Sequence, residues 1–228
     1  MKKALIIAAH PDDDILGCGG VISKYKEKVD FKIIFIAEGS SCRYPFSEIK
    51  NPNTLEVIEL RNSFAIKALK SLGVHSHQFY NLPCGRLDQV PIIQINKIIE
   101  EEIQIFQPDT IFTHSYEDTN NDHRIVHRAT QMATRPGIFK KLESVFSYEV
   151  LSSSEWRFSE VFKPNYFESL SDNDIENKWL ALNEYASEIK NFPFPRSKDG
   201  IYTLAKYRGL QCSHSYAEAF KLIRKFVR

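Results

Sequence analysis

The chain has 228 residues, of which 43% are hydrophobic, and its formal net charge at neutral pH is +1. Length and composition are those of one ordinary globular domain, so we expect a single domain over residues 1–228. The nearly balanced charge gives no electrostatic case for a nucleic-acid partner.

The apolar run near the amino terminus is too short for a membrane span and lacks a signal-peptide cleavage site. The four cysteines, Cys18, Cys42, Cys84 and Cys212, are scattered and form no CxxC pair. This pattern favours free, buried thiols in a reducing compartment over a disulfide framework. We therefore expect a cytoplasmic protein without a membrane span.

Strands and helices are expected to alternate through the first half of the chain, which favours a doubly wound, mostly parallel sheet. The apolar patterns and breaker residues predict strands at 4–9, 31–37, 78–82 and 110–113, and helices at 15–28, 54–72 and 92–106. After residue 140 the pattern changes. There we expect strands at 144–150 and 165–168, and helices at 174–188, 197–208 and 216–226, with no linker that would separate a second domain.

The segment His10-Pro11-Asp12-Asp13-Asp14 follows directly on the first expected strand. Packing does not require three acids there, whereas a divalent cation would offset their mutual repulsion. His10 and Asp13 are three residues apart in a turn that enters a helix, so they face the same way and are assigned to the metal. Asp12 points elsewhere and is the candidate general base for a metal-bound water.

A second segment with metal-ligand chemistry follows the strand that ends at His114. A catalytic zinc site takes three protein ligands and a water, and His123 is the expected third ligand. Asp122 is a candidate to orient an imidazole. His127 competes with His123, but it lies a turn deeper in a helix that runs away from the strand ends. For His114, contact with a ligand and packing at the strand end stay open.

These segments resemble the LmbE-like, or PIG-L, N-acetylglucosaminyl deacetylases, through residues 9–13, residues 122–124 and the spacing between them. The resemblance extends along most of the chain. It implies a Rossmann-like, three-layer α/β/α fold with a mostly parallel sheet and extra C-terminal strands and helices. It also implies one zinc ion (Zn2+) per chain, hydrolysis of an acetamide on a sugar, and the same metal ligands and base as above.

Further parts of the resemblance concern the substrate. Arg61 stands where relatives have a substrate-contacting arginine, and residues 82–88 resemble a family turn that ends in an aspartate, here Asp88. Arg43 is a further candidate for contact with substrate phosphates, as are Arg86 and Arg196, although ion pairing explains such arginines equally well.

Asn120 departs from the family pattern, because many relatives have a histidine at this position. That histidine is thought to stabilise the oxyanion or to protonate the leaving amine. An asparagine can donate a hydrogen bond to the oxyanion but cannot transfer a proton at neutral pH.

The leading interpretation is a zinc-dependent hydrolase that removes the N-acetyl group from a GlcNAc-type sugar, free or linked to a nucleotide or a lipid. The alternatives are a sugar-binding relative impaired by the missing histidine, and a metallophosphoesterase. A dinucleotide-binding oxidoreductase is disfavoured, because Asp12, Asp13 and Asp14 would repel a pyrophosphate at the helix start. The exact sugar and the oligomeric state, including a homo-oligomer, stay open.

Overall fold

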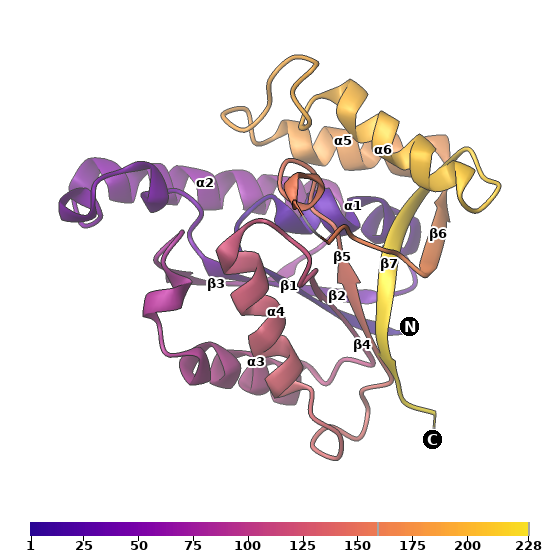
Figure 1. The fold of residues 1–228 in the computed structure, drawn as a ribbon, viewed down its shortest axis with the longest axis horizontal. Coiled ribbons are helices and arrows are strands. Elements are labelled where there is room, and N and C mark those ends of the chain that lie inside the picture. Colours follow the sequence, from indigo (N-terminus) through magenta and orange to yellow (C-terminus); the bar gives the residue numbers. More distant parts are fainter. Residues whose placement is uncertain (159, 228) are drawn as a thin grey trace.

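A computed structural model describes residues 1–158 and 160–227 of the chain. Helices cover both faces of one seven-stranded sheet (Figure 1). The strands are β1 (Lys3–Ala8), β2 (Asp30–Ala37), β3 (Ser76–Leu82), β4 (Thr110–His114), β5 (Ser144–Tyr148), β6 (Tyr166–Leu170) and β7 (Tyr216–Lys225). The helices are α1 (Asp13–Tyr25), α2 (Pro52–Ser71), α3 (Ile92–Phe106), α4 (Asn121–Ala133), α5 (Asp172–Asn183) and α6 (Lys198–Leu210).

The sheet order is β3-β2-β1-β4-β5-β7-β6, and strands β1 to β5 are parallel to one another. β7 is antiparallel to both β5 and β6. The expected three-layer α/β/α fold, with a mostly parallel sheet and extra C-terminal strands and helices, is therefore confirmed.

The central strand β1 is buried on both faces, which explains why its sequence is continuously apolar. Ala4, Ile6 and Ala8 pack in one core with residues of α1, α2, α5 and α6. Leu5 and Ile7 point the other way and pack with residues of α3 and α4. Full burial of each Leu or Ile side chain stabilises the fold by about 1.5–3 kcal/mol.

Helix α1 lies close against the sheet because of its glycines. A Cβ atom at Gly17 would overlap the ring of Tyr148, and one at Gly20 would overlap Leu170. The backbone N–H of Gly20 donates to Glu218 Oε1 from β7 at 2.8 Å. This close approach fixes the start of α1, and with it the acidic segment, above the end of β1.

The expected helix at 216–226 is wrong, because these residues form β7. The alanines and charged residues of this segment favour a helix locally, but helix propensity is weak against tertiary context. The segment fills the position between β5 and β6, where Phe220 lies opposite both Tyr148 and Tyr166. Phe220 is fully buried there, and β7 joins the edge strand β6 to the parallel part of the sheet.

The described part of the chain contains no helix that is long and apolar enough to cross a membrane.

Candidate metal centre

The acidic segment lies at the carboxyl end of β1, next to the carboxyl end of β4. Ligands of doubly wound sheets bind at such strand ends. His10 follows β1, and α1 begins at Asp13. Between them, Asp12 adopts the left-handed backbone conformation with φ of 106°. This conformation costs a non-glycine residue about 1–3 kcal/mol and is found preferentially at functional sites.

His10, Asp13 and His123 converge on one point. Their candidate ligand atoms all lie within 4.8 Å of one another, and all three residues are buried. Asp13 Oδ2 lies 3.3 Å from His10 Nδ1 and 3.2 Å from His123 Nε2. The same oxygen accepts a hydrogen bond from the backbone N–H of His10 at 2.9 Å, which fixes the carboxylate between the two rings.

This cluster fits a divalent cation. Both ring nitrogens of His123 are buried and make no aligned hydrogen bond, although carboxylates lie near them. Burial alone would lower the pKa of each imidazole, but the surrounding carboxylates raise the pKa of His10 to about 9 and that of His123 to about 10. The site therefore stabilises positive charge, and two imidazoles with one carboxylate form a common catalytic zinc set with one position open.

A further carboxylate lies behind each imidazole. Asp122 Oδ2 contacts His10 Nε2 at 3.0 Å, so His10 Nδ1 is the nitrogen that faces Asp13. Asp118 Oδ2 lies 3.2 Å from His123 Nδ1. Carboxylates in these positions fix the orientation of metal-binding imidazoles and raise their basicity. The structure thus brings Asp122 to the place expected of a residue that orients an imidazole.

His114 and His127 differ in their relation to the centre. His114 is fully buried, stacks on His123 with ring centroids 4.0 Å apart, and accepts the backbone N–H of Ala9 at 2.8 Å. Burial holds its pKa well below the usual value, so the ring is neutral. His127 instead contacts the backbone carbonyl of His114 with its Nδ1 at 2.8 Å. Two groups of possible metal ligands occur among the described residues, His10-Asp13-His123 and His10-Cys84-Asp122, and His127 belongs to neither.

Asp12 lies beside the metal cluster in a network of charged side chains. Arg61 Nη2 donates to Asp12 Oδ2 at 3.0 Å, and Arg196 Nη1 donates to the same oxygen at 2.7 Å. Burial raises the pKa of Asp12, and the two guanidinium groups oppose this effect. Glu188 holds both arginines, at 2.6 Å from Arg61 Nη1 and 3.3 Å from Arg196 Nη1.

The other candidate substrate residues lie further out or have structural contacts. Arg43 donates twice to Glu188, at 2.7 and 2.8 Å, and about half of its side chain is exposed. Asp88 is exposed, in the 3-10 turn Leu87–Gln89. Asn120 is the N-cap of α4, and its Oδ1 accepts the backbone N–H of Asp122 at 2.9 Å. Its side-chain oxygen therefore positions the helix turn that carries Asp122 and His123.

The sequence pointed to no role for Asp118 or Glu188, and it suggested a phosphate contact for Arg196 rather than an ion pair with Asp12. Asp118 had a usable signal, since it is an acid on the same loop as His123. Glu188 had none, because it lies in the chain after α5 and meets Asp12 only through the two arginines.

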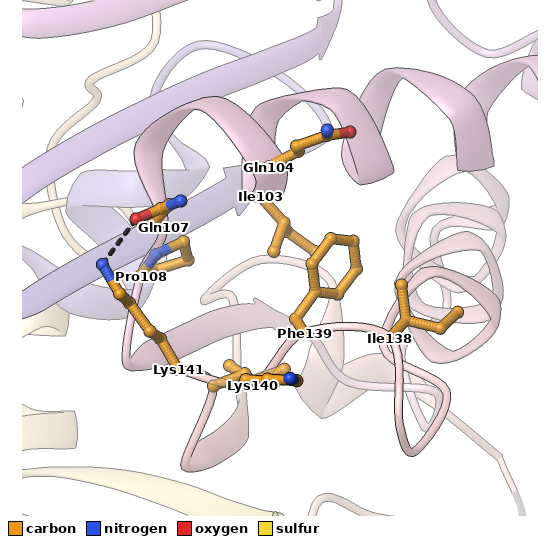
Figure 2. Close-up of a pocket in the computed structure, with 9 residues that line it drawn as sticks. Ile103, Gln104, Gln107, Pro108, Ile138, Phe139, Lys140 and Lys141 are labelled. Atoms are coloured by element: carbon orange, nitrogen blue, oxygen red, sulfur yellow. Dashed lines mark hydrogen bonds between the residues drawn. The ribbon is translucent and has the colours of Figure 1, made fainter.

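A cavity of about 400 Å³ is lined by residues of the C-terminal end of α3 and of the segment before β5 (Figure 2). It lies at the end of the sheet opposite to the metal cluster. Ile103 and Phe139 form its apolar wall, and Lys141 and Gln107 are hydrogen bonded at one side. It is located where α3 ends and the chain returns toward β5, at the amino ends of the strands. No acid or histidine is among its lining residues, so this cavity has no candidate metal ligands like those in the cluster of His10, Asp13 and His123.

A Rossmann-like α/β domain with a buried His-Asp-His cluster and an acid beside it defines a candidate metal-dependent hydrolase. The chain belongs to the PIG-L family, described as GlcNAc-PI de-N-acetylases, whose family model matches residues 5–134. This confirms the family resemblance drawn from the sequence.

Known relatives agree with this family. The chain is 24% identical over 229 residues to a diacetylchitobiose deacetylase of Thermococcus kodakarensis, covering 98% of this chain and 84% of that protein. It is 26% identical over 194 residues to the uncharacterized deacetylase YaiS of Escherichia coli, covering 82% and 91%. It also resembles the solved structure of an N,N'-diacetylchitobiose deacetylase of Pyrococcus horikoshii in complex with an inhibitor, with a TM-score of 0.77 and 20% identity over 97% of this chain and 84% of that one.

Proposed function

We propose that this protein is a zinc-dependent N-deacetylase that removes the acetyl group from a GlcNAc-type sugar. The observation that carries the proposal is the buried cluster of His10, Asp13 and His123 with Asp12 beside it. The family membership and the deacetylase names of the relatives support the reaction type. One zinc ion per chain is the metal that this donor set fits.

His10, Asp13 and His123 would hold the metal, which when bound polarises the acetyl carbonyl and lowers the pKa of a water. Asp12 is the base that takes the proton of the attacking water. Both arginine contacts fall on Asp12 Oδ2, so Oδ1 is the oxygen left for that proton. The same carboxyl group then returns the proton to the leaving amine.

The roles of the remaining residues follow from which of their side-chain atoms are not already held by contacts within the protein. Asn120 uses its side-chain oxygen to cap α4, so only its amide nitrogen can donate to the developing oxyanion. Arg61 orients Asp12, since its guanidinium group donates both to Asp12 Oδ2 and to the carbonyl of Pro11 at 2.8 Å. Its contact with the sugar is proposed from the family resemblance. Arg43 and Asp88, at the exposed rim, are candidates for contact with the sugar or its carrier.

The test combines metal analysis with acetate release. We expect about one zinc per chain, and acetate release from GlcNAc, its nucleotide-linked form or a GlcNAc-lipid, whichever is the substrate. His10→Ala, Asp13→Ala and His123→Ala should each lose the metal, whereas His127→Ala should keep it. Loss of metal in His127→Ala together with retention in His123→Ala would refute the ligand assignment.

Asp12→Asn separates the deacetylase from a sugar-binding relative without activity. The amide keeps the size of the side chain but cannot accept the proton, so we expect a folded, metal-loaded and nearly inactive protein. Full retained activity would remove Asp12 from the mechanism. Release of phosphate without release of acetate would instead support a metallophosphoesterase.

A further inference from the structure

Two cysteines that are 42 positions apart in the sequence meet beside the metal centre. The thiol of Cys84 donates to Cys42 Sγ at a distance of 3.2 Å. Cys42 lies in the 3-10 turn Ser41–Arg43 after β2 and is exposed, whereas Cys84 follows β3 and is buried. All four thiols are free, and Cys18 and Cys84 are buried as expected, whereas Cys42 is exposed and Cys212 is only half-buried.

The two loops that carry these cysteines are held close together. Glu38 Oε2 accepts the backbone N–H groups of Ser40 and Ser41, and its Oε1 accepts that of Cys84 at 2.8 Å. Gly85 allows the close approach, because a Cβ atom there would lie 2.9 Å from the Cβ of Cys42. The sulfurs need to move together by only about 1 Å to reach the length of a disulfide bond.

The buried cysteine is also next to the carboxylate that orients His10. The backbone N–H of Gly85 donates to Asp122 Oδ2 at 2.6 Å, and the same oxygen contacts His10 Nε2 at 3.0 Å. Cys84 Sγ itself lies within 4.8 Å of candidate ligand atoms of both His10 and Asp122. A movement of Cys84 toward Cys42 would therefore displace Gly85 and disturb the support of His10.

We propose that Cys42 and Cys84 form a redox modification site, in which a reversible disulfide loosens Asp122 and weakens metal binding at His10. This goes beyond the deacetylase reaction but depends on the metal centre proposed above. Cys42 is the accessible sulfur, and the hydrogen bond from Cys84 lowers the pKa of its thiol to about 6. The thiolate is the reactive form of cysteine.

The oxidant is a hydroperoxide. The Cys42 thiolate attacks one peroxide oxygen, the O–O bond breaks, and Cys42 becomes a sulfenic acid while the other oxygen leaves as water or an alcohol after protonation. The sulfur of Cys84 then attacks the sulfenic sulfur and forms the S–S bond. The sulfenic oxygen leaves as water with the thiol proton of Cys84. In total the two thiols lose two electrons, and the peroxide is reduced.

The experiment uses the full chain loaded with one equivalent of Zn2+ and treated with a small excess of hydrogen peroxide. Of the four cysteines in the sequence, two should be lost in a thiol count under denaturing conditions, and peptide mapping should find Cys42 joined to Cys84. The affinity for Zn2+, measured by competition with a chromophoric chelator, should fall tenfold or more. Dithiothreitol should restore both the thiols and the affinity.

Matched variants complete the test. Cys42→Ser should retain its affinity for Zn2+ through the same treatment, whereas Cys212→Ser should respond like the wild-type protein. Four intact thiols after treatment, or a disulfide that does not join Cys42 and Cys84, would refute the modification site. A Cys42–Cys84 disulfide with an unchanged affinity for Zn2+ would refute the link to His10. The thiol count does not depend on deacetylation, so it separates this proposal from the proposed function.

Discussion

Replacement of Asp122 by asparagine tests whether the carboxylate behind His10 supports the metal. Asp122 Oδ2 accepts from Gly85 at 2.6 Å and contacts His10 Nε2 at 3.0 Å, while Oδ1 accepts from Leu87 at 3.2 Å. An asparagine has only one oxygen. If that oxygen keeps the two shorter contacts, its amide nitrogen must face the backbone N–H of Leu87, and two donors oppose each other.

The expected magnitude follows from these contacts. Asparagine removes the negative charge that raises the pKa of His10, so the imidazole becomes a weaker ligand and is less firmly oriented. Loss of such a supporting carboxylate typically lowers metal affinity 10- to 100-fold, which corresponds to about 1.4–2.8 kcal/mol. We therefore expect Asp122→Asn to fold, to bind Zn2+ with an affinity lowered by this factor, and to lose activity at limiting metal.

The assay is competition for Zn2+ against a chromophoric chelator, with circular dichroism to confirm folding. Asp88→Asn is the matched control, because it removes an exposed acid from the adjacent 3-10 turn. Asp118→Asn is a second variant, since Asp118 supports His123 in the same way. Affinities of both Asp122→Asn and Asp118→Asn within twofold of the wild type would refute the idea that these carboxylates tune the ligands.

Three further results are expected. Asn120→Ala should lower the free energy of unfolding by about 1 kcal/mol, because the cap of α4 is lost. If the amide nitrogen also donates to the oxyanion, kcat should fall roughly a hundredfold. A wild-type kcat would show that Asn120 only caps the helix. Gly17→Ala should destabilise the protein by roughly 1–3 kcal/mol because the new methyl group overlaps Tyr148. Gly19→Ala should cost less in the same chemical denaturation experiment, because its methyl group would lie 3.0 Å from Lys178 Cγ and 3.1 Å from Ile15 Cγ2, a much milder approach. Without metal, the pKa values of His10 and His123 in the folded protein are about 9 and about 10, above the ordinary 6.5. The stability that these residues contribute is therefore full below pH 6.5 and is lost as the pH rises through 9 to 10, and urea unfolding of the apoprotein should show this decline. The affinity for Zn2+ should rise from pH 6 to pH 9, because metal and protons compete for the imidazoles.

The sequence alone predicted most of the fold and the convergence of the metal cluster. β1 could be predicted because a run of apolar residues ends abruptly in a histidine and three acids. The spacing of His10 and Asp13 is local, so a turn geometry was enough to place them together. His123 could be placed at the same site because its loop follows β4, which lies next to β1 and is parallel to it.

What failed depended on contacts that are distant in sequence. β7 contains helix-favouring residues, and its conformation is decided by pairing with β5 and β6, which no local pattern reveals. The meeting of Cys42 and Cys84 depends on how two loops pack around Glu38.

The two halves of the chain contribute differently to the site. The family model covers residues 5–134, which include all three candidate metal ligands, Asp12 and Arg61. Glu188 and Arg196 lie beyond it, yet they control the surroundings of Asp12, because Arg196 donates to its carboxylate and Glu188 holds both arginines. The chemistry of the centre is thus built from the segment shared with the family. Arg61, in the shared segment, also pairs with the candidate base Asp12, whereas Arg196 and Glu188 come from the C-terminal segment. Differences among relatives in the ion pairs around this carboxylate should therefore be sought in the C-terminal segment rather than among the metal ligands.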